Sequence, residues 1–466
     1  MTRAPAAQVL GRLTSAGRFV QRHIRWAIDR SRKHWFDAIG AGSYIRRAWA
    51  APQVRDLPAR QVYIDVSVIC RSDAATGIQR VVRSVAFLLA RMEGQGPGWS
   101  APIFVYAHKD RHQVVRLEGE RYALTDERVS YAAGDVFVGL DYALDALWRM
   151  RGQLLAMRRA GVRFWYVVHD FLPLTHPQWF SAATVLRFRI WLTLLAATAE
   201  GFFCVSPPVE QELRAILQSR FGRAEDYRTV VIPMGWDMSA AVPSRGLTLG
   251  FDSVLQALRD FPSLLLVGTI EPRKGHADAL DAMERLWSAG DQTRLVLVGG
   301  VGWKTEDLCA RLERHPEAGR RLLLLGKVSD EALELLYARC SGVLVPSLAE
   351  GFGLPVVEAI GRGKHVLARD LPVFAQHTGK GVSFFEQTAS AGQLAQAVGE
   401  WLGGMDRLDP PRPDLLATWS ETAAAIATTF GITPPHGQAG SALPPVGEAG
   451  AQGSRAANLA FTKKHN

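Results

Sequence analysis

The sequence has few cysteines and no pattern that would hold a structural metal ion. Only Cys70, Cys204, Cys309 and Cys340 occur among its 466 residues, and none of them forms a Cys-x-x-Cys pair. Widely scattered cysteines are typical of small buried residues in a reducing compartment, so we expect neither disulfides nor zinc. No Asp-x-Asp pair occurs either, and we expect no metal ion to bridge a bound diphosphate.

Long hydrophobic runs are also missing. No stretch approaches the roughly 20 uncharged apolar residues that span a bilayer, and the nearest, from Phe188 to Val205, is interrupted by Arg189 and Glu200. The N-terminus lacks the apolar core and cleavage site of a signal peptide. We therefore expect a cytoplasmic protein that is soluble or peripheral on the inner face of the membrane.

What the chain does have is length, ordinary apolarity and excess positive charge. Its 466 residues are 48% hydrophobic and carry a formal net charge of +9. That length suits two domains with separate cores. The charge favours an acidic partner, such as a nucleotide, a nucleic acid or an anionic membrane.

The first 58 residues are basic and interleaved with aromatic residues such as Trp26, Trp35 and Trp49. This pattern is typical of an amphipathic segment that lies on an anionic membrane, and we assign that contact to residues 1–55. A solvated helix packed on the main body fits equally well. We expect no nucleic acid as a partner, because no recognised binding module accompanies the charge.

Residues 343–372 are the stretch around which the chain is organised. Val343–Val345 predicts a buried strand, a glycine turn follows at 350–354, and Pro355 marks the start of an apolar helix. A strand, a glycine turn and a helix N-terminus together direct backbone N–H groups at an anion. Glu350 and Glu358 bracket the turn, and carboxylates can accept hydroxyl protons from a sugar and a ribose. Spacing alone leaves an ordinary βα crossover with solvated glutamates equally open.

The run Pro-Ser-Leu-Ala-Glu-Gly-Phe-Gly-Leu-Pro-Val-Val-Glu-Ala resembles the Glu-x7-Glu signature of retaining enzymes in glycosyltransferase family 4. The resemblance implies the GT-B fold, an α/β arrangement of two Rossmann-like, doubly wound parallel-sheet domains that face each other across a cleft. It implies that Glu358 holds the nucleoside ribose. It also implies that Glu350 holds the donor sugar and phosphate together with the turn residues Gly351, Phe352, Gly353 and Leu354.

Two further loops of the second half fit the same resemblance. Arg273 and Lys274 follow a strand and would clamp the diphosphate and stabilise the leaving group. Thr269 stands where the family usually has an arginine, which leaves open whether Arg273 replaces it. Gly300 ends a strand and matches the family's loop near the nucleotide base.

The first half offers two matching segments. Thr76-Gly77-Ile78-Gln79-Arg80 stands where the family carries a Gly-Gly loop that faces the donor phosphates, so Gly77 is a candidate, although a plain tight turn is an alternative. His169 and Asp170 end a strand, where ligands of open parallel sheets bind. They resemble the His-Asp-x-x-Pro segment of family mannosyl- and rhamnosyltransferases, which implies that His169 approaches the sugar from the opposite domain.

These elements predict five segments. They are a basic amphipathic extension (1–58), an acceptor-side Rossmann-like domain (59–240), a nucleotide-sugar domain (241–410), a crossover helix (411–433) and a disordered tail (434–466) that is rich in Gly, Pro, Ala and Ser.

By resemblance, the function is transfer of a hexose, with mannose favoured, from a nucleotide sugar to a lipid-linked oligosaccharide or polysaccharide with retention of configuration. GDP-mannose is the favoured donor, no cofactor is expected, and the resembling enzymes build O-antigen or exopolysaccharide. Two alternatives remain: a nucleotide-sugar 2-epimerase and a catalytically silent GT-B partner subunit. The paired glutamates count against the first, and the retention of Glu350 and Lys274 counts against the second.

Overall fold

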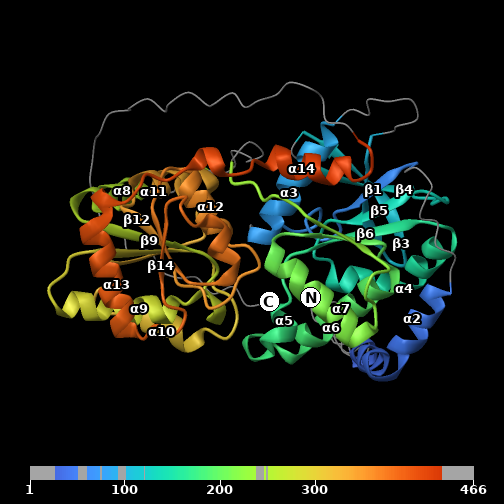
Figure 1. The fold of residues 1–466 in the computed structure, drawn as a ribbon, viewed down its shortest axis with the longest axis horizontal. Helices are drawn as coiled ribbons and strands as arrows, with labels where there is room; N and C mark the ends of the chain where they lie inside the picture. The colour runs from blue at the N-terminus through green and yellow to red at the C-terminus, as the bar shows by residue number, and fades with distance from the viewer. Residues whose placement is uncertain are drawn as a thin grey trace, which may run out of the picture.

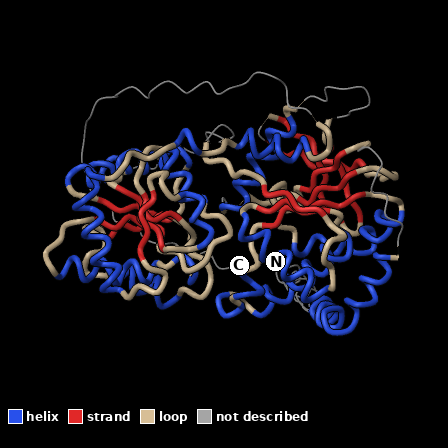
Figure 2. Tube along the Cα trace, viewed as in Figure 1, coloured by secondary structure: helices blue, strands red, loops and turns tan. Residues whose placement is uncertain are grey.

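The computed structural model describes residues 27–50, 60–73, 76–92, 101–119, 121–237, 246–247 and 250–432. The expected segment boundaries after residues 58 and 240, the first 26 residues and the predicted disordered tail (434–466) lie outside these ranges. The described chain forms two bodies side by side, each with strands at its centre and helices on both faces (Figures 1 and 2). This arrangement confirms two doubly wound α/β domains.

The N-terminal domain is built on an eight-stranded sheet in the order β4-β3-β2-β1-β5-β6-β7-β8. Its strands are β1 (Val62–Asp65), β2 (Ile103–His108), β3 (Arg111–Glu118), β4 (Arg121–Arg128), β5 (Val136–Gly139), β6 (Arg163–Val168), β7 (Gly201–Cys204) and β8 (Arg228–Val231). Its helices are η1 (Phe36–Gly40), α2 (Ala41–Trp49), α3 (Gly77–Ala90), α4 (Leu144–Arg159), α5 (Leu172–Thr175), η2 (Pro177–Trp179), α6 (Ala182–Thr198) and α7 (Pro207–Phe221).

One edge of this sheet departs from the expected parallel pattern. β2 pairs with β3, and β3 with β4, in antiparallel fashion. His108 pairs with Arg111, so only Lys109 and Asp110 connect β2 to β3. Two residues suffice for a hairpin, whereas a parallel crossover needs a dozen or more. The strand β4 is largely exposed and charged, so it contains no apolar run from which it could be predicted.

The C-terminal domain has a six-stranded, wholly parallel sheet in the order β11-β10-β9-β12-β13-β14. Its strands are β9 (Ser263–Val267), β10 (Arg294–Val298), β11 (Leu322–Gly326), β12 (Gly342–Val345), β13 (Val366–Arg369) and β14 (Val382–Phe385). Its helices are α8 (Phe251–Asp260), η3 (Pro272–Lys274), α9 (His276–Ser288), α10 (Glu306–Glu313), α11 (Asp330–Arg339), α12 (Leu354–Gly361), η4 (Pro372–His377), α13 (Ala391–Gly404), η5 (Met405–Arg407) and η6 (Pro413–Leu415).

The last described helix, α14 (Trp419–Thr428), returns to the first domain and lies beside α3 (Figure 1). Trp419 is 2% exposed and belongs to the N-terminal core. Its backbone N–H donates to Asp237 Oδ1 at 2.7 Å. Phe430 packs edge-on against Trp165 and Phe203. The helix therefore ties the end of the second domain to the core of the first.

The described part of the N-terminal extension packs on the N-terminal domain. Phe36 and Tyr44 are buried in its core, and Tyr44 OH donates to the Arg151 carbonyl at 2.9 Å. Lys33 Nζ donates to Asp145 Oδ1 at 2.8 Å. Residues 27–50 thus combine a packed face with exposed apolar side chains. The two interpretations of this segment, a membrane contact and a helix packed on the main body, are therefore not exclusive.

The structure also bears on the cysteines and the long apolar runs, both of which are scarce in the sequence. None of the four cysteines forms a disulfide. Within the described ranges, no helix is long and apolar enough to cross a membrane.

Candidate functional site

The glycine turn and the Arg273–Lys274 loop meet because β9 and β12 are neighbours in the sheet. Both strands are parallel, so the loops at their carboxyl ends emerge at one edge. The backbone N–H of Leu348 donates to the Arg273 carbonyl at 2.7 Å, which joins the two loops directly. Sequence reasoning placed both loops in the site, and the structure brings them together.

Glu350 lies between the two cations. Lys274 Nζ donates to Glu350 Oε1 at 2.5 Å, and Arg273 Nη1 donates to Oε2 at 2.9 Å. Ser347 Oγ also donates to Oε1, at 2.8 Å. Burial by itself would raise the pKa of Glu350, but Lys274 and Arg273 outweigh burial and hold the pKa at about 2. The carboxylate therefore stays ionised and is paired with both cations.

The glycine turn is shaped by close approach to other backbone and side-chain atoms. Gly353, with a φ of 91°, precedes α12, and a Cβ there would lie 2.2 Å from the Phe374 ring. The turn before α9 is equally tight, since a Cβ on Gly275 (φ 67°) would lie 2.2 Å from the Pro346 carbonyl oxygen. Only glycine combines a left-handed conformation with such approach.

The N-terminal domain closes directly on this turn. A Cβ built on Gly351 would lie 1.9 Å from the His169 carbonyl oxygen, so the turn packs on the end of β6. From the start of α7, Ser206 Oγ donates to the Gly351 carbonyl at 2.7 Å. The structure thus brings His169 to Glu350's turn from the opposite domain.

His169 is 8% exposed, and its Nε2 atom has no hydrogen-bond partner. Burial lowers its pKa to about 4, so the imidazole is neutral near pH 7. Burial raises the pKa of the neighbouring Asp170, while Arg273 opposes that shift. An unpaired, neutral ring nitrogen at the domain interface is suited to a hydroxyl group of a ligand.

Glu358 has a separate environment from Glu350. It is 3% exposed, and Tyr337 OH donates to its Oε2 at 3.0 Å. Its other oxygen, Oε1, accepts from Nη1 of Arg80, which comes from α3 of the other domain. The two glutamates are therefore held by different partners and do not form a pair.

Gly77 and Phe352 lie at the same interface, whereas Gly300 contacts residues of its own domain. Gly77 begins α3, and a Cβ there would lie 3.4 Å from Leu354 Cδ1. Phe352 is 9% exposed and packs edge-on against His377 at 5.7 Å. At Gly300, a Cβ would lie 2.6 Å from Lys327 Cε. Whether Arg273 replaces the arginine absent at Thr269 stays a prediction, although Arg273 does reach Glu350.

Several contacts were not foreseen from the sequence. Glu271 Oε1 lies 2.7 Å from Arg273 Nη2, and Tyr337 and Arg80 hold Glu358. Ser347 lies within the run that contains the Glu-x7-Glu signature, and Arg80 lies within the Thr-Gly-Ile-Gln-Arg segment. Both residues could therefore have been identified from these motifs. No sequence motif marks Tyr337, because only the packing of α11 beside α12 brings its side chain to Glu358.

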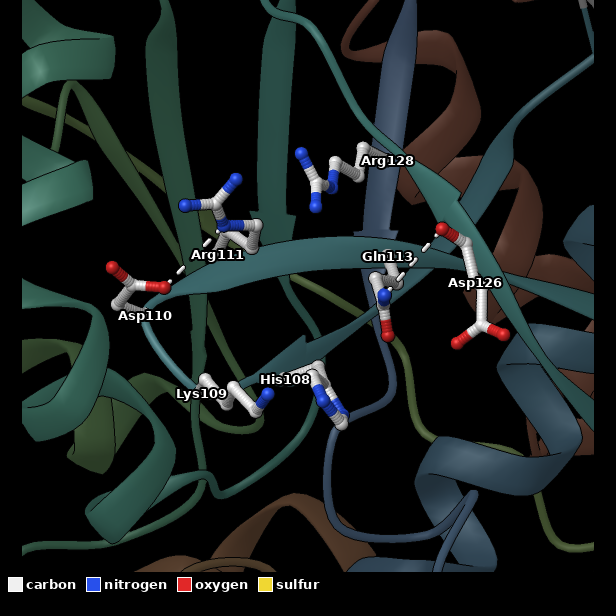
Figure 3. A pocket seen from close by; sticks show the side chains of 7 residues that line it. All are labelled: His108, Lys109, Asp110, Arg111, Gln113, Asp126 and Arg128. Carbon is white, nitrogen blue, oxygen red and sulfur yellow. Dashed lines mark hydrogen bonds and ion pairs between the residues drawn. The ribbon is translucent and has the colours of Figure 1, made fainter.

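A pocket of about 380 Å³ lies away from these residues, in the hairpin edge of the N-terminal sheet (Figure 3). Its lining includes Lys109, Asp110 and Arg111 at the β2–β3 turn and Asp126 and Arg128 on β4. None of the predicted site residues lines it. The predicted site is instead occupied by ion pairs among its own side chains.

Sequence comparison with known proteins points to one family. Residues 254–409 match the family described as glycosyl transferases group 1. The chain is 34% identical over 409 residues to the serotype-specific mannosyltransferase WbdA of Escherichia coli, a match that covers 86% of this chain and 50% of the relative. It is also 37% identical over 108 residues to an Escherichia coli O-antigen chain mannosyltransferase B, covering 23% of this chain and 28% of that protein. The chain thus spans about half the length of the WbdA relatives that it matches.

Solved structures agree on the fold. Anabaena HepE, crystallised with UDP-glucose, superposes with a TM-score of 0.51 at 20% identity, over 80% of this chain and 95% of that one. Sucrose-phosphate synthase from Thermosynechococcus elongatus gives a TM-score of 0.50 at 18% identity, over 80% and 95%. The chain therefore has the GT-B fold, and its residues 254–409 match the family described as glycosyl transferases group 1.

Proposed function

We propose that this chain is a retaining hexosyltransferase that moves mannose from a nucleotide sugar, with GDP-mannose as the favoured donor, to a growing lipid-linked glycan. The observation that carries the proposal is the cluster of Lys274, Arg273 and Glu350 at the glycine turn, closed from the other domain by His169. The relative WbdA is a mannosyltransferase, which supports the choice of sugar.

The chemistry follows from charge and position. Lys274 and Arg273 would stabilise the negative charge that develops on the departing nucleoside diphosphate. When the diphosphate binds between them, the contacts to Glu350 rearrange, and Glu350 becomes available to the donor sugar hydroxyls. His169, neutral and with a free Nε2, would hold a hydroxyl of the same sugar from the other side. The acceptor then attacks from the face of the leaving group, and the leaving phosphate helps to deprotonate it.

In this proposal, neither glutamate acts as an acid, a base or a covalent nucleophile. Glu350 is ionised, and Glu358 accepts hydrogen bonds from Arg80 and Tyr337. Catalysis would come from orientation, charge stabilisation and exclusion of water by closed domains. No metal ion and no cofactor is required by these steps.

Two alternatives are less well supported. WbdA and the O-antigen chain mannosyltransferase B are transferases, which favours transfer over 2-epimerisation. A catalytically silent subunit has no need of an ionised carboxylate held between two cations, and this arrangement is intact here.

The proposed acceptor places the protein at the cytoplasmic face of a membrane. Residues 27–50 carry large exposed apolar side chains on helices that pack on the N-terminal domain, and the segment is basic. Such a surface suits anionic lipid. We therefore extend the proposal to peripheral binding, without a membrane-spanning helix in the described residues.

The decisive experiment uses the purified full chain with GDP-mannose, a panel of other nucleotide sugars and lipid-linked acceptors. Release of nucleoside diphosphate together with a glycan extended by one hexose is expected. Lys274→Ala should lower the transfer rate about 10²- to 10³-fold, as expected for loss of a charge-stabilising group. The matched control is Arg311→Ala, since Arg311 pairs with Asp281 and Glu284 on α9 instead. No transfer with any donor, or full activity of Lys274→Ala, would contradict the proposal.

A further inference from the structure

An ion pair between the two domains occupies the carboxylate that is assigned to the ribose. Arg80 of α3 donates from Nη1 to Glu358 Oε1, and its Nη2 atom lies 3.4 Å from Asp330 Oδ1. Glu358 and Asp330 both belong to the C-terminal domain, on α12 and α11. One arginine of the N-terminal domain thus bridges two carboxylates across the domain interface.

The Glu358 carboxylate is buried in this arrangement and accepts a hydrogen bond at each of its two oxygens. Tyr337 OH donates to Oε2 at 3.0 Å, Arg80 donates to Oε1, and the Glu358 side chain is 4% exposed. A ribose needs a carboxylate that faces it with free lone pairs. Arg80 and a ribose hydroxyl would therefore compete for the same buried oxygen.

The ion pair also depends on closure of the domains. A buried carboxylate without a counter-charge is costly, so removing one partner of a buried pair is strongly destabilising. Without Arg80, the closed arrangement would leave Glu358 buried with only the Tyr337 hydroxyl and the charge of Arg362 to support it, and this would favour opening, which returns Glu358 to water. The pair consequently stabilises the closed arrangement of the two domains.

We propose that the Arg80–Glu358 ion pair is an autoinhibitory latch, which holds the two domains together, masks the ribose carboxylate and is broken when the nucleotide binds. The inference rests on the proposed function, because it takes Glu358 to be the ribose ligand. If about 90% of the empty protein is latched, the apparent affinity for nucleotide is about tenfold weaker than the intrinsic one.

The test measures binding of GDP and of guanosine to the full chain by calorimetry, with UDP, ADP and their nucleosides as a panel. Arg80→Ala should bind the recognised nucleotide and its nucleoside about tenfold more tightly than the wild type. Arg80→Lys keeps the charge but loses the simultaneous contact to Glu358 and Asp330. Its affinity for the nucleotide should therefore lie between those of Arg80→Ala and the wild type. The ligand-free Arg80→Ala protein should also show a larger radius of gyration by small-angle scattering.

The matched control is Arg83→Ala, on the same helix. Arg83 pairs with Asp73 at 2.9 Å and lies 3.8 Å from Asp330, without touching Glu358. Its affinity for the nucleoside should match the wild type.

The sign of the effect decides the outcome. Weaker binding by Arg80→Ala would show that Arg80 contacts the nucleotide, and it would overturn the latch. Unchanged affinity in a protein that still transfers hexose would overturn the latch alone. Failure of both proteins to bind any nucleotide in the panel would overturn the proposed function with it.

Discussion

The His169 carbonyl oxygen occupies the space that any side chain at position 351 would need. A Cβ on Gly351 would lie 1.9 Å from that oxygen and 3.1 Å from Asp170 Cβ. The first contact involves backbone on both sides, so neither partner can rotate away. The close packing of the two domains at the candidate site therefore requires glycine in the turn.

Gly351→Ala should consequently impair transfer more than stability. The added methyl group forces the domains apart at the turn, which exposes the site to water and displaces His169, while each domain keeps its own core. We expect a loss of at least about 10²-fold in kcat/KM, since misplacement by about 1 Å can have that effect. Transfer assays and thermal unfolding of the two proteins measure this.

Gly403→Ala is the matched control. Gly403 lies in α13, and a Cβ added there would have no other atom within 4 Å. Alanine there should leave transfer unchanged and raise helix stability by up to about 1 kcal/mol. Equal activity of Gly351→Ala and the wild type would contradict the importance of this contact.

The low pKa of Glu350 predicts a specific loss of stability in acid. The folded-state pKa of about 2 lies below the ordinary value of 4.5. The contribution is therefore complete above about pH 4.5 and is lost as the pH falls toward 2. The full shift corresponds to about 3 kcal/mol, of which about 2 kcal/mol is lost by pH 3.

Urea unfolding of the wild type and Glu350→Gln between pH 6 and pH 3 isolates this contribution. Glutamine cannot titrate, so the wild type should lose about 2 kcal/mol more than the variant over that range. Comparing the two proteins cancels the acidic groups that do not interact with Glu350; Asp170 is not one of them, because the charge of Glu350 contributes to its raised pKa. If the free energy of unfolding fell equally with pH in the two proteins, Glu350 would not be held ionised by Lys274 and Arg273.

His169→Phe should reduce transfer without weakening nucleotide binding. The phenyl ring keeps the shape of the buried side chain but removes Nε2, which has no hydrogen-bond partner within the protein. Loss of one hydrogen bond to the sugar predicts a fall of about 10- to 100-fold in kcat/KM. Because the pKa of His169 is about 4, the wild-type rate should show no titration of this residue between pH 6 and 8.

The matched control for that variant is His176→Phe, because His176 stacks on Trp179 at 4.3 Å. It should transfer hexose at the wild-type rate. A weakened affinity of His169→Phe for the free nucleoside diphosphate would place His169 at the nucleotide instead of the sugar.

Membrane binding should depend on two exposed residues of the N-terminal helices. Trp35 is 60% exposed and Ile39 68% exposed, so replacing both by serine leaves the packed residues Phe36 and Tyr44 in place. The double variant should bind vesicles containing anionic phosphatidylglycerol about tenfold more weakly, because interfacial apolar area is lost. Vesicle flotation measures this directly.

Leu124→Ser on β4 provides the matched control, since Leu124 is 47% exposed on another surface. Its vesicle binding should equal that of the wild type. Unchanged binding of the Trp35 and Ile39 double variant would remove the assignment of the membrane contact to this segment. Deleting residues 1–55 is a poorer test, because it also removes core side chains.

Much of the fold was readable from local patterns. The apolar runs that precede Gly268, Gly299 and Pro346 all form parallel strands. The strand β4 was missed because its residues are charged and exposed, and its position depends on pairing with β3. Periodicity reports burial, so an exposed edge strand leaves little trace in the sequence.

The sequence by itself determined the two α/β domains, the glycine turn and the residue types that surround it. Strand and helix signals are local, and the signature residues stand in one continuous run. Only the tertiary structure decided that Lys274 and Arg273 hold Glu350, that Arg80 holds Glu358 and that His169 packs on Gly351. These contacts join residues about 80 to 280 positions apart, and their geometry depends on how two separately folded sheets close on each other.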